Sequence, residues 1–373
     1  MIIGIDAINL KSDGGKTHLI EILKNINVSI KNKNEIVVFC NENNKYFLNN
    51  IEFIKIITIP KYLNHWLIVG IWQNLFLSKL VKSYSCDVLL NLNGTYFGKF
   101  KNYVTIPQNL LPFYFKEYIK YKFSLKTLKF LLLKYIHLKC IKNAKGVIFL
   151  SNYQKKLVLS YSKKLPNHKI IPHAAKQFNL NKRQKKIEKF NENNTLKIGY
   201  ISSIEPYKNH DLIIHLLTEI KEKGYPISFH IIGKDSDKPY KKKLIKKIKN
   251  YNKNWIKFYH NIEYSKIEEI YSKLDLTIFG SKCESFGIPV AESIKNSIPC
   301  LCAESDNAKS LFENSVIFFD INNYSESINI IENTIRSLNL RKTFANYHKE
   351  YFYKRTWQDV SNETFKFITN IRN

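Results

Sequence analysis

The sequence predicts an α/β protein of two domains, each built on a parallel sheet. Short runs of β-branched and aromatic residues alternate with amphipathic stretches along the whole chain, a pattern typical of strands joined by crossover helices. The runs form two series, and a polar segment at residues 176–194 separates them. At 373 residues the chain is too long for one ordinary core. We therefore expect two Rossmann-like domains that face a cleft, with ligands at the carboxyl ends of the strands.

The first series of strands occupies the N-terminal half. Its members read IIGID, EIVVFC, FIKIITI, DVLLNL, YVTIP and GVIFL, at residues 2–6, 35–40, 53–59, 87–92, 103–107 and 146–150. Helical stretches lie between them, among them residues 17–26 and 125–141. Four lysines of residues 125–141 spread around a helical wheel, so we expect a crossover helix packed on the sheet with its basic edge outward.

The second series begins at Leu196. It comprises LKIGYIS, ISFHIIG, IKFYH, LTIFG, IPCLCA and VIFF, at residues 196–202, 227–233, 256–260, 276–280, 298–303 and 316–319. The last stretch, residues 356–371, is an amphipathic helix that could cap the second domain or cross back to the first. We expect domains at residues 1–175 and 176–354, and a C-terminal helix within 355–373 that packs on the first domain.

Composition excludes several classes of protein. No run of about 18 uncharged apolar residues appears, which argues against a spanning helix. The N-terminus MIIGIDAIN predicts a buried strand rather than a signal peptide. Six irregularly spaced cysteines suit a reduced cytoplasmic protein, and Cys300 and Cys302 lack metal-ligand spacing.

The net charge of +28 favours an anionic partner. Nearly all of it is lysine, and abundant asparagine and isoleucine alongside suggest the drift of an AT-rich genome. Proteins that recognise nucleic-acid sequences depend largely on bidentate hydrogen bonds from arginine. The chain has only five arginines and no nucleic-acid-binding signature. We expect no nucleic-acid partner, and reversible, salt-sensitive docking on anionic membrane surfaces with little apolar insertion.

Two strand-to-helix junctions carry candidate phosphate-binding features. Gly14 and Gly15 stand at the turn into a helix that we expect to begin near Lys16, where glycine lets the backbone approach an anion. Alternatively, the two glycines serve only the turn of an ordinary loop and bind no ligand. Lys208 follows strand 196–201 at a loop–helix boundary, where it could meet a diphosphate; the alternative is a solvated lysine.

The stretch ESFGIPVAE holds two carboxylates around a predicted helix start. A strand ends at Gly280, and Pro289 suits the first turn of a helix, so the N–H groups of Phe286, Gly287 and Ile288 would form an anion site. We expect Glu284 at the lip of the loop and Glu292 in the first helical turn. Carboxylates can hold vicinal hydroxyls of a sugar or ribose. A role in stabilising the helix dipole would explain Glu292 but not Glu284.

These residues together resemble the retaining GT-B glycosyltransferases of family 4. Glu284 to Glu292 matches the E-x7-E motif of that family, SIEPYKN at 203–209 resembles its IEPRKN-type segment, and GIDAINLKSDGG at 4–15 resembles its glycine loop. Residues 93–113 look like a branch found in bacterial surface-polysaccharide clusters. The resemblance implies transfer of a sugar from a nucleotide diphospho-sugar to a glycan or lipid-linked acceptor, with the first domain binding the acceptor and the second the donor.

The resemblance also implies roles for individual residues. Glu284 would contact hydroxyls of the donor sugar, and Glu292 would hold the ribose. The backbone of Ser285, Phe286, Gly287 and Ile288 would bind the pyrophosphate. Lys208 would neutralise the leaving diphosphate, and Gly14 and Gly15 would close over it from the other domain.

The chain departs from the family pattern at two places. Tyr207 stands where the family usually has an arginine, and Pro107–Gln108 stand where many members carry a histidine. Gln108 or Asn109 could hydrogen-bond the sugar or the acceptor instead. His173 could line the cleft or serve a structural role.

The implied reaction is retaining transfer through an oxocarbenium-like state, in which the leaving phosphate takes the acceptor proton and no carboxylate nucleophile is needed. Asp235 and Asp237 precede a lysine-rich stretch and form no convincing metal motif, so we expect no cofactor and no metal requirement. Two alternatives remain: a non-catalytic partner of the same fold in a polysaccharide assembly complex, and a nucleotide-sugar epimerase.

Overall fold

The computed structural model describes residues 1–60, 65–122, 124–162, 164–178, 190, 194–250, 254–260, 262, 266–346 and 354–371. Most of the polar segment 176–194 lies outside these residues. The chain divides into two compact units. Unit 1 comprises residues 1–118, 122–174 and 356–373, and unit 2 comprises residues 119–121 and 175–355.

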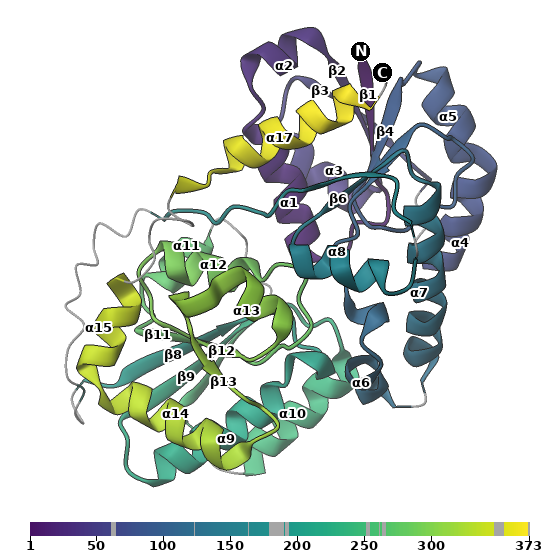
Figure 1. The fold of residues 1–373 in the computed structure, drawn as a ribbon. Coiled ribbons are helices and arrows are strands. Elements are labelled where there is room, and N and C mark those ends of the chain that lie inside the picture. Colours follow the sequence, from purple (N-terminus) through teal and green to yellow (C-terminus); the bar gives the residue numbers. More distant parts are fainter. Residues whose placement is uncertain are drawn as a thin grey trace. The chain divides into compact units, whose positions relative to one another are not determined.

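Unit 1 is built on a seven-stranded parallel sheet (Figure 1). Its order is β3-β2-β1-β4-β5-β6-β7, so the direction of the winding reverses between β1 and β4. The strands are β1 (Ile2–Ala7), β2 (Glu35–Cys40), β3 (Ile54–Thr58), β4 (Val88–Asn91), β5 (Tyr103–Thr105), β6 (Gly146–Phe149) and β7 (Asn167–Ile170). Strands β1, β4 and β6 are buried almost throughout, as continuous apolar runs in a covered parallel sheet should be.

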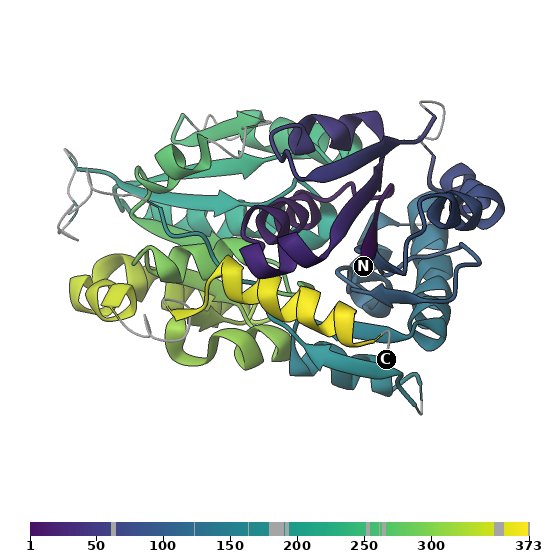
Figure 2. The same ribbon diagram turned by 90° about the horizontal axis from the view of Figure 1, so that it is seen from above.

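Helices connect these strands. They are α1 (Asp13–Lys24), α2 (Val28–Lys33), α3 (Glu42–Leu48), α4 (Trp66–Trp72), the π-helix η1 (Gln73–Leu77), α5 (Ser78–Ser83), η2 (Leu111–Phe113), α6 (Phe115–Tyr118), α7 (Leu125–Asn143) and α8 (Asn152–Leu159). The C-terminal helix α17 (Trp357–Asn370) also belongs to unit 1 and lies beside α1 (Figure 2). Thr356 and Asp359 close a capping box at its start, and the Ser361 hydroxyl donates to the Ile22 carbonyl of α1 at 2.6 Å.

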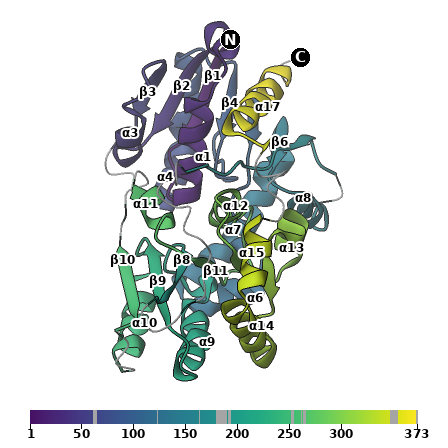
Figure 3. The ribbon, with the colours of Figure 1, turned by 90° about the vertical axis from the view of Figure 1, so that its left-hand side faces the viewer.

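Unit 2 is built on a six-stranded parallel sheet of order β10-β9-β8-β11-β12-β13 (Figure 3). The strands are β8 (Leu196–Ile201), β9 (Ile227–Gly233), β10 (Ile256–His260), β11 (Leu276–Phe279), β12 (Cys300–Ala303) and β13 (Ile317–Phe319). Its helical elements are η3 (Ile119–Tyr121), η4 (Pro206–Lys208), α9 (His210–Glu222), α10 (Lys238–Asn250), α11 (Ile267–Tyr271), α12 (Ile288–Lys295), α13 (Asp306–Phe312), η6 (Glu313–Ser315), α14 (Tyr324–Arg336) and α15 (Leu338–Asn346).

All twelve strands that the sequence predicts are present, and the structure adds β7. Three expectations about helices are wrong. Helix α1 begins at Asp13 rather than near Lys16, because Ser12 caps it by accepting from the Gly15 N–H. Glu292 lies in the second turn of α12, because that helix starts at Ile288. Helix α7 buries one side against unit 1 but also exposes several leucines on another side, so more than its basic edge faces outward.

Three general features of the described residues bear on function. None of their helices is long and apolar enough to cross a membrane. All six cysteines are buried and free, and burial raises the pKa of the Cys300 thiol to about 12. Within this part of the chain, no group of three or more histidine, cysteine or acidic side chains could hold a metal ion.

Candidate active site

The candidate site of unit 2 lies where its sheet reverses direction. Strands β8 and β11 are neighbours, with Leu276 paired to Ile198 and Thr277 to Gly199. Since both strands run the same way, the loops that follow them meet at one edge of the sheet. The order β9-β8-β11-β12 makes this edge the topological switch point, the place where open α/β sheets bind ligands.

The loop after β8 holds Lys208 in a fixed position. Lys208 ends the short helix η4, and Asn209 after it adopts left-handed backbone with φ of 57°. The Tyr200 hydroxyl donates to the Lys208 carbonyl at 2.6 Å, and the Asn209 amide donates to the Gly280 carbonyl at 2.6 Å. The second bond ties this loop to the end of β11, so the side chain of Lys208 is directed by both strands.

Lys208 and Glu284 form an ion pair between the two loops. The lysine side chain is 7% exposed and the glutamate 26%, so the lysine is buried and only the glutamate is partly open to solvent. The Lys208 ammonium also lies 4.8 Å from the centre of the Tyr207 ring and 5.6 Å from that of Phe279. A cation among aromatic faces and one carboxylate is partly desolvated, which strengthens its attraction for an incoming anion.

Beside the Lys208 ammonium, Tyr207 places a neutral aromatic ring rather than a second charged group. Burial raises its pKa well above the usual value, and Glu205 and Glu284 add to the effect. The phenol is therefore neutral at physiological pH. Lys208 is the cation that this loop presents to Glu284.

The loop after β11 turns sharply into α12. Gly287 caps the helix with φ of 90°, a backbone conformation that side chains disfavour, and Pro289 occupies the first turn. The Asn307 amide holds the loop from α13 by donating to the carbonyls of Glu284 at 2.5 Å and Ser285 at 3.3 Å. Ile288, the first residue of α12, has no carbonyl one turn earlier within the helix for its N–H group, so this end of α12 carries the positive end of the helix dipole.

A small pocket opens beside this helix start. Its lining combines Glu284 with hydroxyl, amide and apolar groups. The polar members besides Glu284 are Ser281, Ser305 and Asn307, and Phe286 and Gly287 also line it. A carboxylate, a helix N-terminus and a lysine thus converge within one unit.

Glu292 lies one turn deeper in α12 than the sequence suggests. The side chain is buried, and one carboxylate oxygen accepts from the Tyr271 hydroxyl at 2.9 Å. The same hydroxyl lies 3.2 Å from the Pro289 carbonyl in the first turn of α12. Tyr271 therefore orients Glu292 relative to the start of the helix.

Unit 1 has a second candidate region, after β1 and β5. Gly15 is buried in the first turn of α1, where a Cβ would come within 2.7 Å of Leu10 and 2.8 Å of Ser12, whereas Gly14 is exposed. The Gln108 amide nitrogen lies 2.7 Å from His18 Nδ1. Burial lowers the pKa of His18 to about 3, so the imidazole is neutral and Nδ1 accepts this hydrogen bond.

His173 and Asn109 differ in their surroundings. His173 is buried, with its ring 4.3 Å from that of His18 and 5.5 Å from that of Trp357 on α17. Asn109 is exposed, and its side chain accepts from the Leu111 N–H at 3.0 Å. The structure thus groups Gln108 and His173 around His18, and it leaves Asn109 outside this group.

Asp235 and Asp237 have other partners. Asp235 pairs with Lys241 and lies 3.2 Å from His260, and Asp237 accepts from the Tyr240 N–H at 2.9 Å at the start of α10. Both carboxylates therefore serve local structure.

The sequence did not reveal Asn307, Tyr271 or His18 as members of these sites. Asn307 follows β12 by four residues, so its position after a strand end was a usable signal. Tyr271 and His18 lie within helices, and no local signal in the sequence distinguishes them.

Comparison with known proteins places the chain in a family. The model for the glycosyl transferases group 1 matches residues 152–351, which is more than half of the chain. Protein CapJ of Staphylococcus aureus is 28% identical over 180 residues. That match spans 46% of this chain and 42% of CapJ, so it leaves more than half of CapJ uncovered.

Three solved structures resemble the whole chain. HepE of Anabaena, crystallised with UDP and glucose, has a TM-score of 0.73 at 16% identity and covers 99% of this chain and 100% of its own. Sucrose-phosphate synthase from Thermosynechococcus elongatus scores 0.76 at 10% identity, with 100% and 99% covered. WaaG, a glycosyltransferase involved in lipopolysaccharide biosynthesis, scores 0.72 at 12% identity, with 99% and 100% covered. At these identities the likeness shows the fold, which is the predicted GT-B. The chain belongs to the glycosyl transferases group 1.

Proposed function

We propose that the protein is a retaining glycosyltransferase of bacterial surface-polysaccharide biosynthesis. It moves a sugar from a nucleotide diphospho-sugar to a hydroxyl of a glycan or lipid-linked acceptor at the cytoplasmic face of the membrane. The observation that carries this proposal is the Lys208–Glu284 pair beside the start of α12. Family membership supports it, as do HepE, crystallised with UDP-glucose, WaaG in lipopolysaccharide biosynthesis, and the partial match to CapJ.

The donor would bind along the edge formed by the loops after β8 and β11. The diphosphate would lie at the start of α12, against the backbone of Ser285–Ile288, where the helix dipole favours negative charge. Glu284 is partly exposed beside this place and would accept hydrogen bonds from sugar hydroxyls. Glu292, oriented by Tyr271, would hold the ribose.

Catalysis would come from positioning and electrostatics. As the glycosidic bond breaks, negative charge grows on the diphosphate, and Lys208 would stabilise it. Lys208 now pairs with Glu284, so donor binding would share or replace that contact without moving the lysine backbone. The acceptor hydroxyl would attack from the face that the nucleotide leaves, and the leaving phosphate would take its proton.

The reaction would need no metal ion. Lys208 and the N–H groups of α12 supply positive charge to the diphosphate, which is the task a divalent cation would otherwise perform. The carboxylates of Asp235 and Asp237, the nearest to a metal motif in the sequence, are engaged in local contacts. We therefore expect equal rates with and without a chelator.

Product analysis tests this proposal. The protein would be incubated with nucleotide diphospho-sugars and lipid-linked or oligosaccharide acceptors, and the anomeric configuration of the product would be read by NMR. Retention of the donor configuration is the expected result, and inversion would contradict the mechanism. Conversion of the donor sugar without an acceptor would instead indicate an epimerase, and binding without turnover would indicate a non-catalytic partner.

A further inference from the structure

Helix α7 carries apolar side chains on two opposite sides. Leu133, His137, Cys140 and Ile141 are buried against unit 1. Leu125, Leu128, Leu132 and Tyr135 are exposed, Leu125 by 87% and Leu128 by 64%. At about 100° per residue, the buried set and the exposed set centre on directions roughly 145° apart. The expectation of a crossover helix that turns only its basic edge outward is therefore wrong for this helix.

The neighbouring segment α4–η1 adds to this surface. Leu67, Ile71 and Leu75 recur every fourth residue and are all exposed, Ile71 by 63%. The ammonium of Lys129 on α7 lies 5.5 Å from the centre of the Trp66 ring on α4, which joins the two elements. Figures 1 and 2 both show α4 and α7 as neighbours at one side of unit 1. We call the exposed side chains of α4–η1 and α7 the apolar face.

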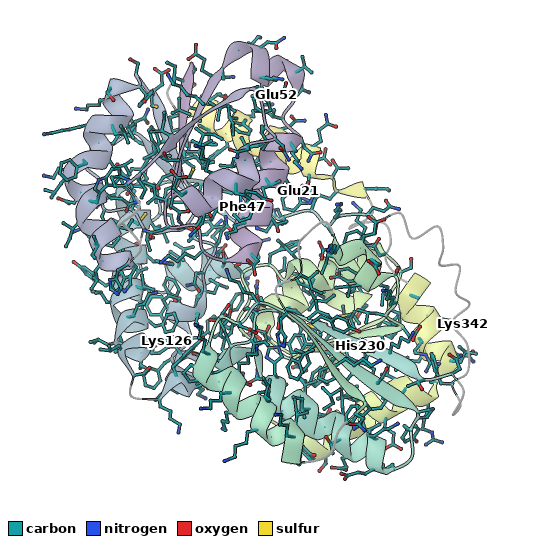
Figure 4. The ribbon with its side chains drawn as sticks, turned by 180° about the vertical axis from the view of Figure 1, so that it is seen from behind. Glu21, Phe47, Glu52, Lys126, His230 and Lys342 are labelled. Atoms are coloured by element: carbon teal, nitrogen blue, oxygen red, sulfur yellow. The ribbon has the colours of Figure 1, made fainter. Side chains whose placement is uncertain are left out.

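Positive charge surrounds this face, and negative charge is nearly absent. Between Asp87 and Glu188 the sequence contains one acidic residue, Glu117, and that side chain is buried. On a helical wheel Lys139 falls among the exposed leucines of α7, and Lys142 falls within about 40° of the nearest of them; both lie roughly two to five turns further along the helix. Lys126, labelled in Figure 4, is exposed near the start of the helix.

A surface that combines exposed leucines with lysines is complementary to an anionic lipid bilayer. Soluble proteins seldom leave several large apolar side chains together in water. A nucleic acid would match the lysines but not the leucines, and a second copy of this chain would match the leucines but not the like charges. A bilayer surface with anionic headgroups offers apolar chains and negative charge at the depths where leucine and lysine side chains would lie.

We propose that the apolar face is a membrane-docking surface that inserts its leucines at the boundary of headgroups and acyl chains of an anionic bilayer. The lysines attract the surface at long range, and the leucines then hold it. This docking would depend on apolar insertion as well as on charge. The inference does not rest on the proposed glycosyl transfer, since vesicle binding needs neither donor nor acceptor.

Co-sedimentation with vesicles tests the proposal. The full-length protein would be mixed with phosphatidylcholine vesicles, with or without phosphatidylglycerol, at low and high salt. We expect binding to the anionic vesicles, loss of most of it at high salt, and a blue shift of tryptophan fluorescence from Trp66 and Trp72 on α4. Equal binding to neutral and anionic vesicles would overturn the proposal, as would no binding to either.

Variants separate the two contributions. The triple substitution L125S, L128S and L132S should weaken binding to anionic vesicles at least about tenfold, because three apolar side chains no longer leave water. A matched control, V28S with Y46S, changes side chains of unit 1 that are 68% and 77% exposed but lie on α2 and α3. The control should bind as the unaltered protein does.

The lysine contribution is tested with K139Q and K142Q, which should together weaken binding about 25-fold at low salt and far less at high salt. The control pair K24Q and K45Q lies elsewhere on unit 1. An equal loss of vesicle binding in the test pair and in the control pair would show that net charge alone drives binding, which would overturn the location of the docking surface. An unchanged affinity in the leucine variant would overturn the proposal, and a dimer that this variant abolishes would assign the face to a second copy.

Discussion

At the scale of single residues, Lys208 is the side chain with the clearest chemical task. Lys208→Ala should lower kcat more than it weakens donor binding, since charge on the diphosphate grows as the bond breaks. Steady-state kinetics beside calorimetric donor titration would separate the two effects. Lys243→Ala, at an exposed lysine of α10, is the control. A loss of kcat no larger than in this control would remove Lys208 from the mechanism.

Tyr207 offers a companion test of the same loop. The phenol is neutral and stands beside the ammonium of Lys208. We expect Tyr207→Arg to be tolerated, with donor binding unchanged or tighter, because an added cation would face Glu205 and Glu284. A protein that no longer folds or binds donor would show that the aromatic ring itself is required.

Glu292 and Tyr271 form a second pair at this scale. Glu292→Ala should weaken nucleotide-diphosphate binding by about 1.5–3 kcal/mol if the carboxylate bridges ribose hydroxyls. Tyr271→Phe removes only the hydroxyl that orients Glu292 and should cost less, about 0.5–1.5 kcal/mol. Calorimetry on both variants checks the order, and unchanged affinity in Glu292→Ala would exclude the ribose role.

At the scale of elements, the turn from β11 into α12 depends on Gly287. Gly287→Ala should cost about 1 kcal/mol of stability from the positive φ and should also weaken nucleotide binding, because the added methyl would lie 3.3 Å from the Phe312 ring beside the pocket. Gly224→Ala is a matched control with φ of 89° and open space around it. Thermal melts and donor titrations should show a stability loss in both and a binding loss only in Gly287→Ala.

Most strands were predictable from the sequence, whereas one edge strand and one helix boundary were not. Twelve strands were predictable because each is a short run of apolar, often β-branched residues, and most of these runs are buried in their sheets, although β3 and β10 are partly exposed. β7 was missed because Asn167, His168 and Lys169 give it no apolar pattern, and it lies half-exposed at the edge of its sheet. The start of α1 was misplaced because glycines discourage helix, while the cap from Ser12 overrides that tendency.

Contacts between distant segments were beyond prediction from local patterns. The positions of Lys208 and Glu284 after strands were visible in the sequence, but their ion pair depends on β8 and β11 being neighbours. Likewise, the wheel of α7 gave the angles of its lysines but not which apolar side would be buried. The roles of Gln108, Asn109, His173, Gly14 and Gly15 in binding remain predictions.

At the scale of the whole molecule, buried histidines should make stability depend on pH. Burial lowers the pKa of His18 and His210 to about 3 and that of His137 to about 4, against an unfolded value of 6.5. The unfolded chain therefore takes up protons first, and stability should fall as pH drops below 6.5. Asp6, whose pKa burial raises to about 6, opposes this, because the folded protein gains its proton first as the pH falls.

Burial also lowers the pKa of His230 to about 4, so four histidines oppose one aspartate, and the melting temperature should be lower at about pH 5.5 than at about pH 7.5. His137→Leu should reduce this difference, because it removes one group that must stay neutral in the folded protein. His215→Leu, at an exposed position of α9, is the control and should leave the difference unchanged. Melts that are insensitive to pH in this range would contradict the assignment of neutral, buried imidazoles.

The most direct test of the account is donor binding in the presence of a chelator. Melting temperatures would be measured for the unaltered protein and for Glu292→Ala with a panel of nucleotide diphospho-sugars at up to about 1 mM, the upper range of ordinary KM values. If a nucleotide-sugar site lies at the β8–β11 edge, at least one of them should raise the melting temperature without metal, and the rise should shrink in Glu292→Ala. If none of the panel stabilises the protein, with or without divalent metal, the central claim of a nucleotide-sugar site at the β8–β11 edge is contradicted.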